Sequence, residues 1–371
     1  MSKTLTATAI LITTMIGAGF LGMPYVISQS GFAIGILELV AIGTILMVTM
    51  LYLGEIVLRT KEHHQLTGYA EKYLGQRGKK AMAFSLVVGI YSALIAYLIA
   101  QGESWSFIIT NTTYYALPLG IAIWALMSAI SYFDIRTLKR SETLVLALIC
   151  ILLILLAITS IPNLSLNNLQ TISIKNAFSP LGIILFSFLG YSAVPEIARI
   201  LKKDKSKMKR SIIYAHSFVL FVYALFTFLV LGVYSTNTPE VATLALGKPF
   251  VLLGIITIFG AYISLSIALM DMFRSDYQFK KNEAWAFTTI IPLALFIILS
   301  LTNNLSFTKI LSFGGIIAGG LALFLILAMV KQAKLHGNRH PEYKIPYSKA
   351  FIVISIIILA IGLFTEIKNL I

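Results

Sequence analysis

Long apolar stretches, rather than alternating apolar and polar residues, dominate this sequence. A helix needs ~20 apolar residues to cross the hydrocarbon core of a bilayer, and eleven stretches of suitable length are separated by polar segments. They cover residues 5–28, 31–58, 81–109, 115–133, 143–162, 177–198, 211–236, 249–272, 284–302, 308–330 and 350–369. None has the ~10-residue alternating segments of a transmembrane β-barrel. We therefore predict an all-α polytopic membrane protein with eleven transmembrane helices.

The composition supports a membrane location. Of the 371 residues, 58% are hydrophobic and 12% are charged, and the mean hydropathy is +0.89. A soluble domain has about twice this share of charged residues. Because a water-soluble fold could not bury so much apolar surface, lipid is the expected surrounding partner.

The positions of the basic residues predict the orientation. If the N-terminus is cytoplasmic, the N-terminal tail and the loops 59–80, 134–142, 199–210, 273–283 and 331–349 carry 25 of the 29 lysines and arginines. This asymmetry agrees with the positive-inside rule and with the span count, and it places the C-terminus outside. The net charge of +14 is explained by this topology, so no nucleic-acid partner is expected.

The chain is predicted to form one transmembrane domain, residues 1–371. Residues 5–28 are too long for a signal-peptide core and have no small-residue cleavage site. The single cysteine, Cys150, excludes an internal disulfide. Short loops and the lack of soluble appendages favour a prokaryotic plasma membrane.

Two apolar stretches are interrupted in the same way. The first contains Gly19-Phe-Leu-Gly-Met-Pro24 and the sixth contains Gly190-Tyr-Ser-Ala-Val-Pro195, each reading Gly, aromatic, three residues, Pro. Glycine and proline weaken a helix. Because the two stretches lie five helices apart, the second copy would be inverted in the membrane. This pattern predicts discontinuous first and sixth helices in an inverted repeat, with halves at 5–162 and 177–330 and an extra helix at 350–369.

Such interruptions predict a binding site at the bilayer midplane. Backbone without helical hydrogen bonds is costly in lipid and persists where it lines a protein cavity or binds a ligand. A half-helix that begins near Phe20 directs free N–H groups and a positive dipole end at the centre, which suits a carboxylate. Unwound carbonyls suit an ammonium group or Na⁺. The two together match an amino acid zwitterion, whereas the alternative is a pair of kinks that serve helix packing.

The sequence also resembles a known family. The segment Thr13-Thr-Met-Ile-Gly-Ala-Gly-Phe-Leu-Gly-Met-Pro-Tyr-Val-Ile-Ser-Gln-Ser-Gly-Phe32 is similar to the opening of the amino acid/auxin permease family, within the amino acid–polyamine–organocation superfamily. Ala96-Tyr-Leu-Ile-Ala-Gln-Gly-Glu103 resembles the family's third helix. Phe188-Leu-Gly-Tyr-Ser-Ala-Val-Pro-Glu196 resembles its broken sixth helix, and Lys205-Ser-Lys-Met-Lys-Arg-Ser211 its following basic loop. The resemblance implies a LeuT-type five-plus-five inverted repeat, amino acid substrates and cation-coupled uptake, with no cofactor beyond a possible Na⁺.

The resemblance also implies a set of substrate-binding residues. They are Ile16, Gly17, Ala18, Gly19 and Phe20 in the first break, Ser187, Phe188, Leu189, Gly190 and Tyr191 in the sixth, and Ile95 and Ile99 in the third span. Most contacts would be made by backbone, with Phe188 and Tyr191 lining or gating the side-chain pocket. Neither break contains a charged residue, which favours neutral substrates.

The coupling ion is left open between H⁺ and Na⁺. By resemblance, a Na⁺ site would use Thr13, Ile16, Ala261 and Ser264, of which Ser264 is the one confidently placed hydroxyl. Intramembrane carboxylates are the other candidates, because charge in lipid is expensive and usually functional. Glu103 is our first choice among them, whereas Glu55 lies near a cytoplasmic end and is expected to reach the water. The outer segment 239–247 is expected to form a short helix over the vestibule.

Other functional classes lack supporting motifs. The chain has no His-Glu-x-x-His, no Walker motif and no Cys/His metal spacing, so we do not expect an enzyme. Nothing resembles the selectivity filter of a channel. An amino acid exchanger and a non-transporting amino acid sensor on the same fold stay as alternatives. The expected function is secondary active transport of neutral amino acids by alternating access, coupled to H⁺ or Na⁺.

Overall fold

The computed structural model describes residues 3–370 apart from 134–141, 203, 303 and 305, and this part of the chain is built from helices without a strand. The predicted loop 134–142 therefore lies almost wholly outside the described residues. The helices are α1 (Lys3–Met15), α2 (Gly19–Ser30), α3 (Phe32–Leu58), α4 (Leu66–Thr110), α5 (Ala116–Tyr132), α6 (Glu142–Ser160), α7 (Leu181–Ser187), α8 (Ala193–Ile200), α9 (Met208–Tyr234), α10 (Thr243–Leu246), α11 (Lys248–Tyr277), α12 (Lys281–Leu301), α13 (Phe307–Gly314), α14 (Gly320–His336) and α15 (Lys349–Leu370).

The first span is discontinuous, as predicted. α1 and α2 are separated by residues 16–18 and meet at an angle of 56°. Pro24 lies inside α2, in the second turn, where the ring removes one hydrogen-bond donor. The glycines at 17 and 19 place a flexible backbone on both sides of Ala18, which explains why the helix ends here.

The sixth span is broken in the same way. α7 ends at Ser187 and α8 begins at Ala193, so residues 188–192 are not helical. Pro195 lies in the first turn of α8, where a missing N–H costs little. Neither half is long enough to cross a bilayer alone, so the span exists as the pair. The two breaks thus occur at the first helix of each predicted half.

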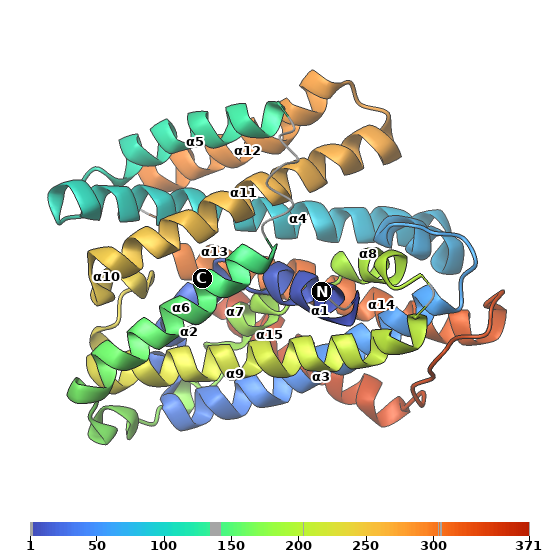
Figure 1. Cartoon of the computed structure of the whole chain (residues 1–371), viewed down its shortest axis with the longest axis horizontal. Helices are drawn as coiled ribbons and strands as arrows, with labels where there is room; N and C mark the ends of the chain where they lie inside the picture. The colour runs from blue at the N-terminus through green and yellow to red at the C-terminus, as the bar shows by residue number, and fades with distance from the viewer. Residues whose placement is uncertain (1–2, 134–141, 203, 303, 305, 371) are drawn as a thin grey trace.

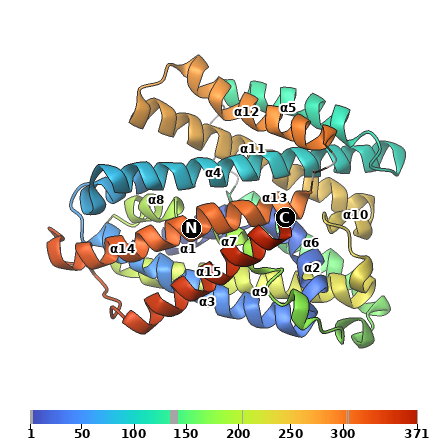
Figure 2. The same ribbon diagram turned by 180° about the vertical axis from the view of Figure 1, so that it is seen from behind.

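Four helices form one packed group. α4, α5, α11 and α12 contact one another and run side by side in both views of the molecule (Figures 1 and 2). Of the four half-helices, α1 and α2 contact α9, and α2, α7 and α8 contact α3. On the other side, Tyr97 of α4 lies against Gly17 in the first break. The breaks are therefore enclosed between a four-helix group and two long helices.

The structure differs from the sequence prediction at the start of α4. We expected a loop up to residue 80, but α4 begins at Leu66. Leu66, Tyr69, Ala70 and Tyr73 are buried and follow the i, i+3, i+4, i+7 spacing of an amphipathic helix. Gly75, with φ 72°, separates this first segment from the apolar part. Hydropathy alone missed the segment because its other face is charged.

The span count is supported in part. Among the described residues, seven helices are long and apolar enough to cross a bilayer, and the bent pair α1–α2 is an eighth. Ala116–Tyr132 and Lys349–Thr365 are apolar but shorter. The expected number of eleven spans stays a prediction.

The tenth span contains a local change of helix type. Residues Gly315–Gly319 form a π-helical turn between α13 and α14. Ser85 on α4 donates a hydrogen bond of 2.7 Å to the carbonyl of Ala318 within this turn. A Cβ at Gly315 would lie 1.9 Å from the carbonyl oxygen of Gly182 on α7, so the glycine is needed for this contact. The turn thus packs directly on α7, the first half of the broken sixth span.

Candidate functional site

The C-terminal ends of two half-helices converge on one side chain. α1 ends at Met15 and α7 ends at Ser187. The hydroxyl of Tyr223, on α9, lies 2.9 Å from the carbonyl oxygen of Met15 and 2.8 Å from that of Ser187. Tyr223 is fully buried. Because each helix end carries partial negative charge, one donor serves two electronegative groups.

Glycines allow the two breaks to touch. A Cβ at Gly19 would lie 2.2 Å from Ser187 Oγ, and a Cβ at Gly190 would lie 2.7 Å from Met15 Cγ. Side chains cannot approach so closely without displacing their neighbours. These are the glycines that open the two matched sequence motifs, so the repeated motif reflects a mutual close approach of the broken helices.

Tyr97 on α4 lies against the first break. A Cβ at Gly17 would lie 2.8 Å from Tyr97 Oη, so the hydroxyl is adjacent to the unwound backbone. α2 begins two residues later, and the first four N–H groups of a helix have no partner within it. A hydroxyl beside free N–H groups is a donor set suited to a carboxylate. The sequence analysis missed Tyr97, although it lies inside the quoted third-helix motif.

Ile95 and Ile99 are buried on α4 but do not share the face of Tyr97. Side chains two positions apart on an α-helix point in directions that differ by ~200°. The side chain that the structure brings to Gly17 is therefore the tyrosine between them. Residues on the same face as Tyr97 lie one turn away, at Ala93 and Gln101. The side-chain amide of Gln101 donates a hydrogen bond of 2.8 Å to the carbonyl of Ile255 on α11.

The aromatic side chains of the breaks are packed into the bundle. The Phe20 ring meets Phe226 edge-on at 5.1 Å. The Phe188 ring stacks on His216 at 5.9 Å and meets Tyr223 edge-on at 5.3 Å. Phe188 is therefore held against α9 by two ring contacts.

The remaining predicted residues line the same region. Ile16, Ala18 and Gly190 are buried, Gly17 is half-buried, and Leu189 packs with a methyl group 3.2 Å from the Cβ position of Gly319. Within the described part of the chain, the hydroxyls of Ser187 and Tyr191 are buried and make no hydrogen bond. Buried polar atoms are nearly always paired. Two unpaired hydroxyls within one break are consistent with a site that a polar ligand completes.

The residues expected for Na⁺ lie in different environments. The Thr13 hydroxyl donates to the carbonyl of Ala9 at 2.9 Å, within its own helix. Ala261 is half-buried, and Ser264 faces outward on α11. The buried serine on this stretch of α11 is Ser266, one turn from the buried Tyr262. Sequence spacing alone gave no means of separating the two serines.

The carboxylate candidates occupy different environments. Glu103 is half-buried near the C-terminal end of α4 and interacts electrostatically with Glu240. Glu240 accepts hydrogen bonds from Ser306 Oγ at 2.9 Å and from the Thr308 N–H at 3.0 Å, at the start of α13. The segment 239–247, which carries Glu240, contains the expected short helix, α10. The N–H of Ala242 in this segment donates a hydrogen bond of 3.0 Å to the carbonyl of Leu21.

Glu55 does not reach the water, contrary to expectation. It is fully buried and accepts hydrogen bonds from Arg59 Nε at 2.8 Å, Lys334 Nζ at 2.7 Å and the N–H of Ile345 at 2.8 Å. Two basic partners from different helices allow the carboxylate to be buried. The Tyr343 hydroxyl, on the same connection as Ile345, donates 2.8 Å to the carbonyl of Leu51. Glu55 thus fastens the α14–α15 connection to the C-terminal end of α3.

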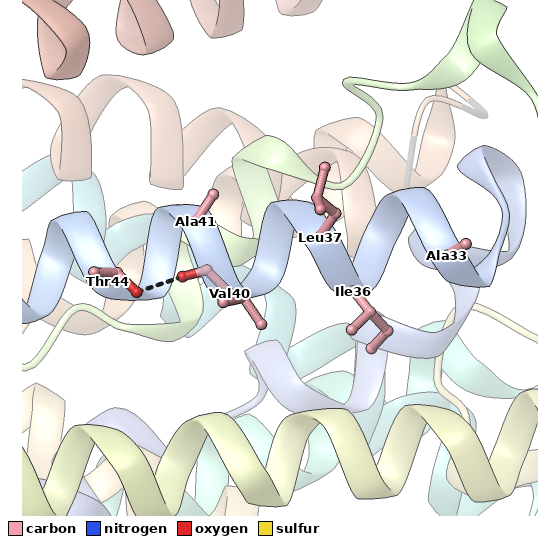
Figure 3. Close-up of a pocket in the computed structure, with 6 residues that line it drawn as sticks. All are labelled: Ala33, Ile36, Leu37, Val40, Ala41 and Thr44. Carbon is pink, nitrogen blue, oxygen red and sulfur yellow. Dashed lines mark hydrogen bonds between the residues drawn. The ribbon is translucent and has the colours of Figure 1, made fainter.

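A surface hollow on α3 is separate from this site. Its lining side chains all come from one helix and are mostly apolar: Ala33, Ile36, Leu37, Val40, Ala41 and Thr44 (Figure 3). Leu37 is 73% exposed, and the Thr44 hydroxyl bonds back to the carbonyl of Val40. An apolar exposed face on a long membrane-crossing helix is suited to lipid tails.

The fold and the paired breaks define a helical membrane protein with discontinuous helices. The sequence profile of the tryptophan/tyrosine permease family matches residues 1–245. The chain belongs to this family. The match confirms the expected amino acid permease resemblance, and it identifies the chain as an integral multi-pass membrane protein of a transporter family, not an enzyme.

Known relatives are amino acid transporters at low identity. The chain is 22% identical over 359 residues to Glutamine transporter 2 of Aliivibrio fischeri, covering 89% of this chain and 91% of that protein. It is 22% identical over 244 residues to Tyrosine-specific transport system 1 of Haemophilus influenzae, covering 64% of this chain. The match spans 60% of the length of that tyrosine transporter.

A solved structure confirms the fold. The crystal structure of MhsT in complex with L-phenylalanine superimposes with a TM-score of 0.72 and covers 98% of both chains at 15% identity. At this identity the similarity establishes the architecture, the LeuT-type inverted repeat with broken first and sixth helices. Together, the family match and this architecture support a role in amino acid transport.

Proposed function

We propose that this protein is a secondary active transporter that carries neutral amino acids across the plasma membrane by alternating access, coupled to H⁺ or Na⁺. The observation that carries the proposal is the meeting of the two broken helices beside Tyr97, in a chain of the tryptophan/tyrosine permease family. The names of the two relatives specify tyrosine and glutamine, both of which are neutral amino acids.

The substrate carboxylate binds at the start of α2. The N–H groups of Gly19 and Phe20 begin the first turn of α2 beside the break, and the Tyr97 hydroxyl lies beside Gly17. Both are donors, and the positive end of the helix dipole adds to the attraction for an anion. No charged side chain lies between residues 16 and 20 to compete for this position.

The ammonium group binds unwound carbonyls of the two breaks. A primary ammonium has three donors, and backbone carbonyls in a non-helical segment satisfy such a group without a buried counter-charge. The sixth break has no Asp, Glu, Lys or Arg from Ser187 to Tyr191. A charged substrate side chain would have no partner there, which supports neutral amino acids.

Alternating access requires two bodies that move relative to each other. The packed group α4, α5, α11 and α12 supplies one of them, and the broken helices with α3 and α9 supply the other (Figure 1). We propose that the broken helices rock against the four-helix group, with the N-terminus cytoplasmic and the C-terminus outside in a prokaryotic plasma membrane.

Uptake into proteoliposomes tests this proposal. Purified protein is reconstituted, and a radiolabelled panel of neutral amino acids that includes tyrosine, tryptophan and glutamine is offered under an imposed proton gradient and then an imposed Na⁺ gradient. Accumulation above the external concentration under one gradient supports symport and identifies the ion. Binding without uptake under either gradient contradicts symport and favours the exchanger or sensor alternatives.

A further inference from the structure

The Tyr223 hydroxyl stands at a position of concentrated negative potential. α1 and α7 both end there, and the carbonyl oxygens of Met15 and Ser187 lie within 2.9 Å of the same oxygen atom. Each helix C-terminus is equivalent to roughly half a negative charge. In transporters with discontinuous helices, such ends and unwound carbonyls hold the coupling cation.

The side chain that fills this position is rigidly held. Tyr223 has no exposed surface, and its ring meets the Phe188 ring edge-on at 5.3 Å and 74°. Phe188 is itself part of the sixth break and packs with its ring tip 3.1 Å from the Cβ position of Gly43 on α3. The hydroxyl is therefore positioned by contacts from three elements and does not depend on a ligand.

A hydroxyl has one proton, and two carbonyls share it. Met15 O also accepts a hydrogen bond of 2.9 Å from the N–H of Gly17. The Tyr223 proton is thus the shared donor that joins the inner half of the first span to the outer half of the sixth. Few other groups on a neutral side chain could make this junction between two converging carbonyls.

We propose that the Tyr223 hydroxyl takes the place of a bound cation at the junction of the two broken helices. The ends of α1 and α7 are then held together by a hydrogen-bond donor that belongs to the protein itself. The coupling ion of the proposed transport cycle then acts at another position. The inference rests on the proposed function for its meaning in transport, but its test measures stability and does not need transport.

The test compares thermal unfolding of the full-length purified protein in NaCl, KCl and choline chloride at equal ionic strength. Tyr223→Phe keeps the ring and removes the donor, and its midpoint is expected to fall by several degrees in all three salts. Tyr223→Asn opens space and supplies a side-chain oxygen beside the two carbonyls. Its midpoint in NaCl or KCl is expected to exceed that in choline by several degrees more than in wild type.

Tyr214→Phe is the matched control, because Tyr214 lies on the same helix and is 58% exposed. It should leave the midpoint and its salt response unchanged. A Tyr223→Phe protein with the wild-type midpoint would overturn the proposal, and this variant decides the matter if the Asn variant yields no folded protein. A Tyr223→Asn protein whose salt response equals that of wild type would also overturn it. Failure of uptake with these stability results intact would remove only the proposed function.

Discussion

Gly19 and Ser187 lie in direct contact across the two broken helices. A Cβ at Gly19 would be 2.2 Å from Ser187 Oγ and 3.1 Å from the Ser187 backbone Cα. The N-terminus of α2 and the C-terminus of α7 therefore touch through a glycine and a small hydroxyl side chain. This contact fixes how the donor end of one half-helix is placed relative to the acceptor end of the other.

Gly19→Ala is expected to reduce uptake by roughly 5- to 150-fold, because overpacking a close contact costs about 1–3 kcal/mol. Part of the loss should be recovered in Gly19→Ala/Ser187→Gly, which removes the obstructing side chain. Gly260→Ala is the control, since no atom lies within 4 Å of its Cβ position. Initial uptake rates in proteoliposomes measure all three. Equal rates for Gly19→Ala and Gly260→Ala would show that the contact has no role in transport.

Tyr97→Phe is expected to weaken substrate binding while the protein remains folded. A hydrogen bond to a charged group is worth about 1.5–3 kcal/mol, which is roughly a 10- to 100-fold change in apparent affinity. The loss should be specific for the carboxylate. We therefore expect wild type to prefer an amino acid over its amino alcohol strongly, and the variant to discriminate much less in competition assays. Undiminished discrimination would place the carboxylate elsewhere.

Glu103→Gln is expected to abolish stimulation of uptake by a proton gradient if H⁺ is the coupling ion. The carboxylate is half-buried and interacts with Glu240, so it is placed to exchange a proton with the outer side. Glu283→Gln, which alters an exposed carboxylate at the start of α12, is the control. Proton-stimulated uptake that survives in Glu103→Gln would exclude this residue as the carrier.

Ser266→Ala and Ser264→Ala separate the two serines of α11. If Na⁺ is the coupling ion and binds against this helix, the buried Ser266 is the better-placed ligand, because Ser264 faces outward. We expect Ser266→Ala to raise the Na⁺ concentration needed for half-maximal uptake and Ser264→Ala to leave it unchanged. The reverse order would restore the ligand set that the sequence resemblance implied.

Glu55→Gln is expected to lower stability by about 1.5–3 kcal/mol, since it removes the charge that accepts hydrogen bonds from the partly buried Arg59 and Lys334. Glu62 provides an exposed comparison: its hydrogen bond with Lys72 lowers the pKa of Glu62 to about 2. Because that pKa is lowered, any stabilisation by Glu62 is present near neutral pH and is lost as the pH falls toward 2. Thermal unfolding of Glu55→Gln and Glu62→Gln at neutral pH should therefore show a large loss and a small one.

The breaks could be predicted from sequence because glycine and proline act locally. The repeated Gly–aromatic–x–x–x–Pro pattern marked both broken spans: its first copy directly follows the break at residues 16–18, and its second copy overlaps the break at residues 188–192. Tyr97 and Tyr223 could not be found in the same way, because their roles depend on contacts with backbone far along the chain. Tyr223 lies 208 residues from Met15 in sequence. An apolar helix offers several tyrosines, and spacing alone does not show which one meets a broken end.

The burial of the Glu55 carboxylate could not be predicted from the local sequence either. Glu55 lies near the inner end of α3, where a carboxylate can reach water, but Lys334 and the backbone of Ile345 come from the opposite end of the chain. The amphipathic start of α4 was missed for a related reason, because its apolar stripe is narrow and averages out in a hydropathy window.

Counterflow in proteoliposomes tests the central claim most directly, since it needs no assumption about the coupling ion. Vesicles are loaded with unlabelled neutral amino acid and diluted into a trace of the same labelled compound without an ion gradient. A carrier that alternates access predicts transient accumulation of label above equilibrium, absent in Gly19→Ala and present in Gly260→Ala. No accumulation from a folded protein that still binds the compound would contradict transport and leave a sensor on the same fold.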